Sequence, residues 1–101
     1  MVRVTVPRVV RVMLERGRLA TLRTYPYRAG SNVIVKYTAG LEERRVKALV
    51  EEVIENPSPE VLEEYLDISG FDSAKEWWLT AVSLHKREPR YLVVLSLQST
   101  E

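Results

Sequence analysis

The stretch RGRLATLR, residues 16–23, lies between a short helical pattern and a strand-like run in the first half of the chain. Its glycine ends the helical pattern, because glycine readily adopts the left-handed conformation found at helix ends. The residues that follow predict a strand over 19–25. In the two-residue period of a strand, Thr21, Arg23 and Tyr25 share one face. A hydroxyl, a guanidinium and an aromatic ring are therefore expected side by side, an arrangement suited to a polar ligand.

Strands and helices alternate on both sides of this stretch. Alternating apolar residues and turn signals predict five strands, at residues 2–6, 19–25, 32–38, 44–54 and 90–98. Residues 44–54 also fit a helix, since their apolar positions recur at helical spacing and alanine and glutamate favour helices. The last strand is apolar on both faces, which predicts an interior position in the sheet.

Three helices are expected between these strands. Pro7 suits the first turn of a helix that ends at residue 17. Ser58 can cap a second helix that closes at Gly70, and Ser73 with Glu76 forms a capping box for a third, which stops before Pro89. The sequence therefore predicts a single α+β domain over residues 1–101.

Composition excludes several classes of protein. The chain is 46% hydrophobic and 29% charged, as in ordinary folded domains. It contains no cysteine, so disulfide scaffolds, thiolate zinc sites and cysteine nucleophiles are excluded. Its apolar runs are too short to span a bilayer, and we expect a cytoplasmic protein without a membrane partner. Abundant Arg, Glu and Val with few amides suggest a thermophilic source.

The net charge of +1 conceals a strong separation of charge. Residues 1–50 hold 11 Lys and Arg against 3 Glu, whereas residues 51–101 hold 4 against 11 Asp and Glu. Such asymmetry is one indication of a surface that interacts with polyanions. The alternative is that basic strands and acidic helices neutralise each other within the fold.

The order of these elements resembles the ASCH domain family. The chain has a helix, a turn similar to G-x-K-x-x-T-x-R that leads into a strand, a basic hairpin, an acidic helical insert and a terminal strand. The insert SGFDSAKEWW, residues 69–78, adds to the likeness. The resemblance implies a PUA-like fold, a small mixed β-barrel of about five strands with three helices at its rim. It also implies RNA binding, and in some members action on RNA or nucleosides.

Carried over residue by residue, the resemblance assigns Thr21 and Arg23 to the family's Thr and Arg positions. Arg18 stands where the family usually has Lys, and Arg16 where it usually has Gly. In a branch that resembles acetylcytidine amidohydrolases, this Lys carries the hydrolysis together with the Thr and a Glu. The chain has Ser69 at the position of that Glu, with Asp67 two residues away.

An arginine cannot realistically lose its proton to act as base or nucleophile. We therefore expect a binding module rather than an enzyme. The alternative is a hydrolase acting on modified nucleosides or RNA, either acetylcytidine amidohydrolase-like or ribonuclease-like. A third alternative is a module that binds a small anion or a protein at the same place.

The predicted site is a basic cleft that holds RNA or a nucleotide, built around Arg18, Thr21 and Arg23. Two guanidiniums could clamp a phosphate, and the hydroxyl could bond a sugar or a base edge. The full predicted set adds a second arginine, a stacking tyrosine and a strand lysine: Arg16, Arg18, Thr21, Arg23, Tyr25 and Lys36. The sequence supports neither a metal nor a cofactor.

Three other residues could have functional or structural roles. Trp77 and Trp78 are adjacent on a helix and point about 100° apart, so at most one of them can line a cleft. Core packing is the more common role of large aromatic residues. His85, the only histidine, is expected to be structural, because no neighbouring pattern supplies a nucleophile or a metal ligand.

Overall fold

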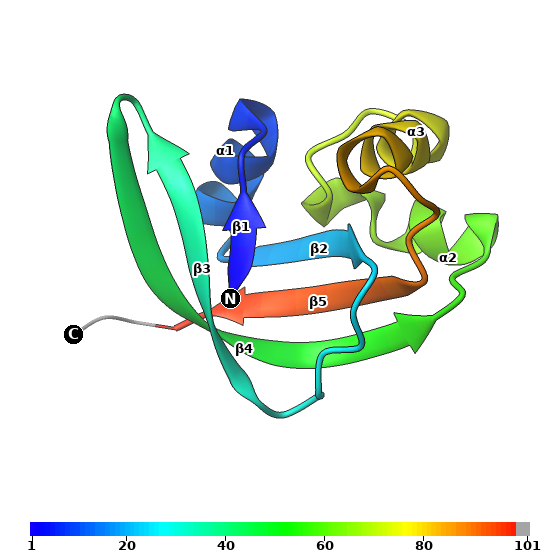
Figure 1. Cartoon of the computed structure of the whole chain (residues 1–101), viewed down its shortest axis with the longest axis horizontal. Helices are drawn as coiled ribbons and strands as arrows, with labels where there is room; N and C mark the ends of the chain where they lie inside the picture. Colours follow the sequence, from blue (N-terminus) through cyan, green and yellow to red (C-terminus); the bar gives the residue numbers. More distant parts are fainter. Residues whose placement is uncertain (99–101) are drawn as a thin grey trace.

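The computed structural model describes residues 1–98, and its main feature is a curved five-stranded sheet (Figure 1). In spatial order the strands are β1 (Val2–Val4), β3 (Asn32–Ala39), β4 (Glu42–Glu55), β5 (Tyr91–Leu97) and β2 (Arg18–Arg23). β1 pairs with β3 in parallel, and the other neighbours are antiparallel. The sheet is mixed and forms a half-barrel, because its two edge strands, β1 and β2, are not paired with each other.

Three α-helices flank the sheet within the described residues: α1 (Pro7–Arg16), α2 (Pro59–Glu64) and α3 (Ala74–His85). A short 3-10 helix, η1 (Leu66–Ile68), follows α2. Figure 1 shows α1 beside β1 near one end of the sheet, and α2 and α3 together at the other end. The expected α+β class, with about five strands and three helices, is confirmed at this level.

The helix ends follow the sequence signals. Pro7 occupies the first turn of α1, and Gly17 ends that helix at φ +71°, where its N–H donates to Met13 O. The Ser58 hydroxyl accepts from Val61 N at the start of α2. These contacts satisfy main-chain groups that a helix end would otherwise leave without partners.

The helix expected between Ser58 and Gly70 is divided in the structure. α2 ends after Glu64, and Tyr65 leaves the helical conformation at φ −106° and ψ 9° before η1 begins. The Tyr65 hydroxyl donates to Glu52 Oε1 over 2.6 Å, a contact that attaches this break to β4. The expectation of one continuous helix was therefore wrong.

β5 separates two hydrophobic cores. Val93 and Leu95 pack into a core with α1 and β1, whereas Leu92 and Val94 pack into a second core with α2, η1 and α3. Successive residues of a strand point to opposite faces, so one apolar strand can serve both cores. β5 is paired on both sides, as its apolar sequence predicts.

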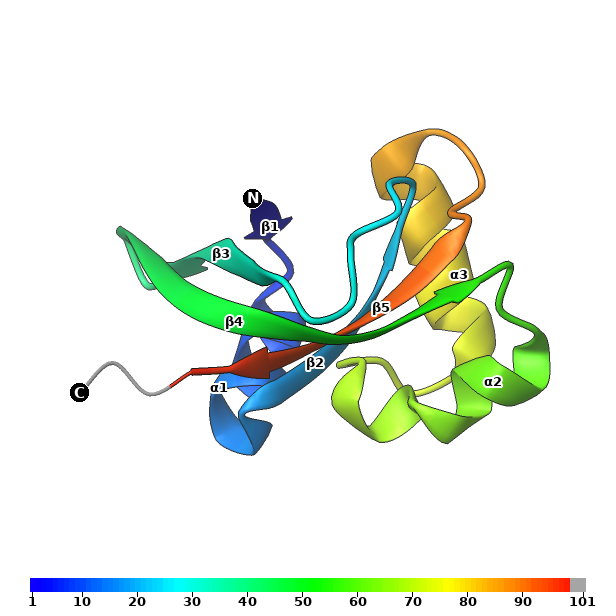
Figure 2. The same cartoon turned by 90° about the horizontal axis from the view of Figure 1, so that it is seen from below.

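β4 is a single long strand that bends along the length of the molecule (Figure 2). The helix alternative for this segment is wrong, because pairing with both β3 and β5 outweighs its helix propensity. Val50 and Val53 both face the first core, although three positions apart they would point to opposite faces of a regular strand. A β-bulge between Val50 and Glu52 supplies the extra residue, so Glu51 and Glu52 both remain exposed.

Candidate nucleic-acid interface

A cleft of about 260 Å³ lies between the unpaired edges of β1 and β2. Its walls come from β1, the start of α1, β2, the loop after η1 and one face of α3. No helix within residues 1–98 is long and apolar enough to cross a membrane.

Arg23 is a charged residue that lines this cleft. Its Nε donates to Thr21 Oγ1 over 3.1 Å, and one Nη2 hydrogen is donated to Arg3 O over 2.8 Å. Burial lowers the pKa of Arg23 below that of an exposed arginine, and Tyr27 opposes this effect weakly. Among residues 1–98 no ion pair joins Arg23 to a carboxylate. A guanidinium has five N–H groups, so donors remain for an anionic ligand.

Thr21 and Arg23 belong to the same strand and lie side by side, as the two-residue period of a strand predicts. The Thr21 hydroxyl accepts from Arg23 Nε and keeps its own hydrogen for a second partner. Both residues line the cleft. This pair is the part of the predicted site that the structure brings together.

His85 also lines the cleft, at the end of α3. Its Nε2 lies 3.1 Å from Leu22 O. A carbonyl oxygen can only accept, so Nε2 carries the hydrogen in this contact. Leu22 belongs to the edge strand β2, and this bond satisfies a main-chain group that faces away from β5.

The free edge of β2 contributes main-chain polar groups to the cleft. Arg23 O and Gly17 O both accept from the β5 segment, from Arg90 N and Leu97 N. Alternate residues of an edge strand point to opposite sides, so the N–H and C=O groups of Ala20 and Leu22 are directed toward the cleft. Leu22 O already accepts from His85, so the groups of Ala20 and the Leu22 N–H are the ones that a nucleobase edge can match.

The remaining wall of the cleft is largely apolar, although Arg3, Thr5 and Thr80 also line it. Val4, Val9 and Trp77 are buried and form its floor, and Phe71 and Leu84 are more exposed. Trp77 is only 2% exposed, whereas Trp78 is half-buried away from this cleft. Of the two tryptophans, only Trp77 lines this cleft, whereas Trp78 lines a separate, shallow apolar hollow between α2 and α3.

The loop after η1 is held tightly against α1. Gly70 has φ +88°, and a Cβ at this position would lie 2.7 Å from Val9 Cα. Ser69 is 1% exposed, and its hydroxyl donates to Leu66 O and accepts from Phe71 N. The Ser69 hydroxyl is therefore committed to the loop, although the residue lines the cleft.

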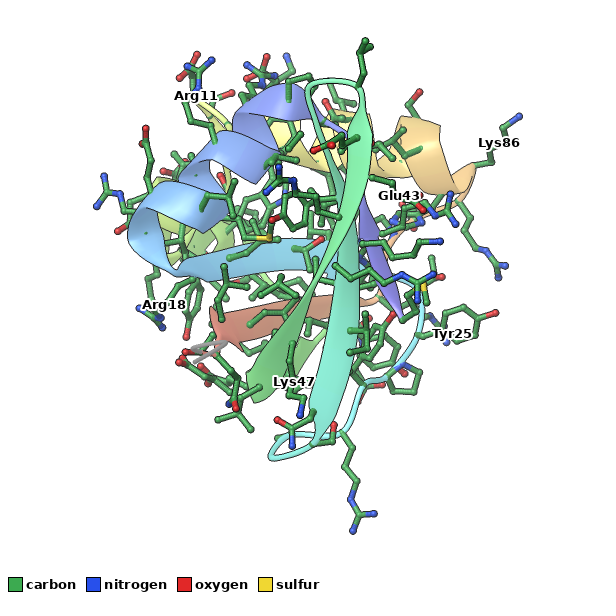
Figure 3. All side chains as sticks on the ribbon, turned by 90° about the vertical axis from the view of Figure 1, so that its left-hand side faces the viewer. Arg11, Arg18, Tyr25, Glu43, Lys47 and Lys86 are labelled. Atoms are coloured by element: carbon green, nitrogen blue, oxygen red, sulfur yellow. The ribbon has the colours of Figure 1, made fainter. Side chains whose placement is uncertain are left out.

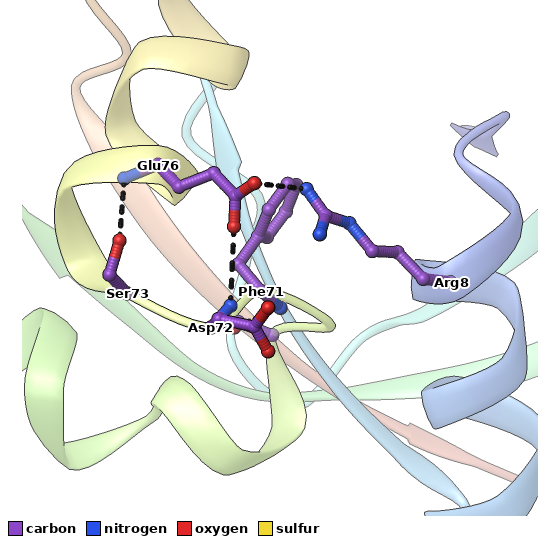
Figure 4. Close-up of polar contacts among 6 residues, drawn as sticks. Arg8, Phe71, Asp72, Ser73 and Glu76 are labelled. Atoms are coloured by element: carbon purple, nitrogen blue, oxygen red, sulfur yellow. Dashed lines mark hydrogen bonds and ion pairs between the residues drawn. The ribbon is translucent and has the colours of Figure 1, made fainter.

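Phe71 is fixed in the cleft wall by a network shown in Figure 4. The Arg8 guanidinium lies 4.7 Å from the Phe71 ring centroid and pairs with Glu76 Oε2 at 2.8 Å. Glu76 Oε1 accepts from Asp72 N, and Glu76 N donates to the Ser73 hydroxyl. In a usual capping box Glu76 would accept from Ser73 N, but here it accepts from Asp72 N, one residue earlier. The ion pair with Arg8 joins α1 to α3.

Arg18 does not reach the cleft. In the two-residue period it shares a face with Ala20 and Leu22 rather than with Thr21. Its Nη2 instead pairs with Glu51 Oε1 at 3.0 Å, at the opposite end of β2 from Arg23. The structure therefore does not form the phosphate clamp of two arginines that the sequence suggested.

The other three predicted residues are also dispersed. Arg16 is exposed in the last turn of α1. Tyr25 is 71% exposed and projects outward on the side of the molecule opposite Arg18 (Figure 3). Lys36 lies on β3, where its Nζ is 3.3 Å from Glu43 Oε1. None of these side chains lines the cleft.

The sequence allowed one tryptophan of α3 to line a cleft, but it did not indicate that Ala81 and His85 line the cleft as well. Trp77, Ala81 and His85 recur at four-residue intervals and form one helical face, which the sequence does show. Their position beside Leu22, 63 residues from His85, depends on tertiary packing. Arg3 was missed as well, because its contribution to Arg23 is a main-chain carbonyl.

The two oppositely charged halves are not neutralised by direct pairing in the described chain. Four ion pairs occur among residues 1–98, and only Arg8–Glu76 and Arg18–Glu51 join the two halves. Within residues 1–98, most cations of the first half therefore have no ion pair with an acid of the second half. In the same part of the chain, no three His, Cys, Asp or Glu side chains gather as they would around a metal ion.

No protein-family model, curated protein or solved structure matches the chain. The resemblance to ASCH domains therefore stays a prediction.

Proposed function

We propose that the protein is an RNA-binding module that holds one unpaired nucleotide in the cleft between β1 and β2. The observation that carries this proposal is the environment of Arg23. It is a partly buried guanidinium at a cavity, without a carboxylate partner among residues 1–98. Because a charge removed from water without a counterion is costly, a phosphate that supplies the missing charge would be bound favourably.

The size and walls of the cleft favour a single nucleotide. Its volume of about 260 Å³ is near the lower limit of typical ligand pockets and is far too small for a duplex. The apolar floor at Val4, Val9 and Trp77 suits the face of a base. The main-chain groups of Ala20, the Leu22 N–H and the Thr21 hydroxyl suit its polar edge. The resemblance to the PUA-like ASCH family implies the same class of ligand.

The hydrolase alternative has less support. The residues that line the cleft include no Lys, Asp, Glu or Cys, and Arg18, at the family's Lys position, lies elsewhere. His85 is the one titratable acid–base group among these lining residues, and its Nε2 is bonded to Leu22 O. Incubation with N4-acetylcytidine should therefore give no deacetylated product.

The proposal is tested by comparing two arginines of the same strand. Arg23→Gln should weaken binding of uridine monophosphate about 10- to 100-fold, because a hydrogen bond to a charged group contributes about 1.5–3 kcal/mol. Arg18→Gln removes the same charge outside the cleft and should change the affinity less than about 2-fold, as expected for an exposed ion pair. Isothermal titration calorimetry measures both.

An equal loss of affinity in both variants would contradict the proposal, because it would indicate a general effect of charge. Urea unfolding of each variant checks that the fold is retained. Product formation from acetylcytidine would replace the proposal with the hydrolase alternative.

A further inference from the structure

A row of cations crosses three strands on the outer face of the sheet. In the register, Arg3 of β1 lies opposite Lys36 of β3, and Lys36 lies opposite Arg45 of β4. Residues directly opposite each other share a face, so these three side chains project from the same side. Lys47 lies two residues further along β4 on the same face. We call these four residues the basic row.

The row is not explained by the stability of the sheet. Neighbouring strands are about 4.8 Å apart, and like charges directly opposite each other are destabilising. Over residues 32–49 of the β3–β4 hairpin, the outer face carries a single acid, Glu43, which pairs with Lys36, whose side chain is only 14% exposed. Arg3, Arg45 and Lys47 are exposed, and none has an ion pair within residues 1–98.

The opposite face of the same three strands shows a contrasting pattern. Val2 and Val4 of β1 and Val35 of β3 are buried in the first core. The outer face could have been covered with mixed or acidic residues at no cost to that core. Its charged residues are instead four cations and one acid, and this excess of positive charge indicates a polyanionic partner.

The row begins at the cleft. Arg3 O accepts the hydrogen bond from Arg23, while the Arg3 side chain is exposed on the outer face. From Arg3 to Arg45 the row crosses three strands, or about 10 Å, a distance that a few successive phosphates of one strand can cover.

We propose that the basic row binds the phosphates of the RNA strand that continues beyond the nucleotide in the cleft. The path of the RNA strand from the cleft to the row rests on the proposed function. The existence of the row does not. The partner is single-stranded RNA, because its free end must enter a cleft that excludes a duplex.

The test uses two double variants that remove the same charge. Arg45→Gln with Lys47→Gln removes two cations of the row, neither of which lines the cleft. Arg11→Gln with Lys75→Gln removes two exposed cations of α1 and α3 that belong to no ion pair in the described chain. Figure 3 shows Arg11 on the side of the molecule away from Lys47.

The probes are uridine monophosphate and an oligouridylate of about 12 nucleotides, within the site sizes of small single-strand-binding domains. Binding is measured by calorimetry and fluorescence anisotropy at several salt concentrations. For single strands, the slope of log K against log salt changes by about 0.7 for each phosphate contact.

The row variant should weaken oligouridylate binding and reduce the magnitude of its salt slope by about 1.4, with unchanged affinity for uridine monophosphate. The control variant should retain the wild-type slope. Equal slopes in the two double variants would overturn the proposal, and so would binding of polyglutamate as tight as that of the oligouridylate.

The two proposals fail in different ways. If uridine monophosphate does not bind but the oligouridylate binds with a slope that depends on the row, the cleft assignment fails and the row stands. If Arg23→Gln weakens mononucleotide binding while the row variant behaves as wild type, the row fails and the cleft stands. Wild-type protein that binds neither probe would overturn both.

Discussion

The Arg23 guanidinium donates to the main-chain carbonyl of Arg3 over 2.8 Å. It so connects β2 with β1, the two edge strands of the half-barrel, which do not pair with each other. This hydrogen bond crosses a gap where a closed barrel would have a main-chain ladder. It also places a positive charge in a partly buried position without a carboxylate partner among residues 1–98.

The first prediction concerns the role of Arg23 in stability. Arg23→Leu loses the bond to Arg3 O but also removes an uncompensated charge from a desolvated site. These effects oppose each other, so the free energy of unfolding should remain within about 1 kcal/mol of wild type. Urea denaturation measures it. A loss above about 3 kcal/mol would mean that Arg23 is mainly a structural clamp and not a ligand-binding group.

The second prediction concerns the loop that carries Phe71. Gly70→Ala should destabilise the protein by about 2–4 kcal/mol, because it adds overpacking against Val9 to the cost of a positive φ. Gly30→Ala is the matched control, since Gly30 has φ +90° and nothing within 4 Å of an added Cβ. Thermal or urea unfolding of both variants gives two losses of stability, and the difference between them is the cost of the steric contact with Val9. Equal losses would show that the contact with Val9 is easily relieved.

The third prediction concerns pH and the network of Figure 4. The hydrogen bond from Arg8, followed by that from Asp72 N, lowers the pKa of Glu76. A carboxyl group whose pKa is lowered by folding stabilises the protein above its unfolded pKa, and that contribution is lost as the pH falls through the folded pKa. Glu76→Gln should therefore be less stable than wild type at pH 7, and the difference should diminish below about pH 4.

Unfolding curves measured between neutral and acidic pH check this expectation. Glu63→Gln provides the control, because Glu63 is exposed on α2 and belongs to no ion pair in the described chain. A Glu76→Gln difference that stays constant from pH 7 to the acid limit would show that the Glu76 charge does not contribute to stability.

The sequence predicted the order and type of the main elements because their signals are local. Gly17, Ser58 and Ser73 mark helix ends through contacts within a few residues, and the apolar run of β5 indicates burial on both faces. The segment that forms β4 was ambiguous, because its propensity favours a helix and only pairing with distant strands makes it a strand. The bulge at Glu51 likewise depends on that pairing.

The only part of the site that the sequence predicted correctly is the pair of residues that belong to a single strand, β2. Thr21 and Arg23 come together because they are two residues apart, and the same alternation directs Arg18 to the other face. His85 and the Arg3 carbonyl enter the site through contacts between elements far apart in sequence. Residue type alone does not reveal such contacts, since a lone histidine on an apolar helical face is most often structural.

The residues that line the gap between β1 and β2 are largely separate from the strand pairs that hold the sheet together. Side chains such as Val6 and Leu84 line the gap, and no hydrogen bonds between β1 and β2 have to break when those side chains change rotamer or identity. Substitutions there could alter which ligand fits while the paired strands and the two cores continue to supply most of the folding energy. Such a scaffold can acquire new ligand preferences at little thermodynamic risk.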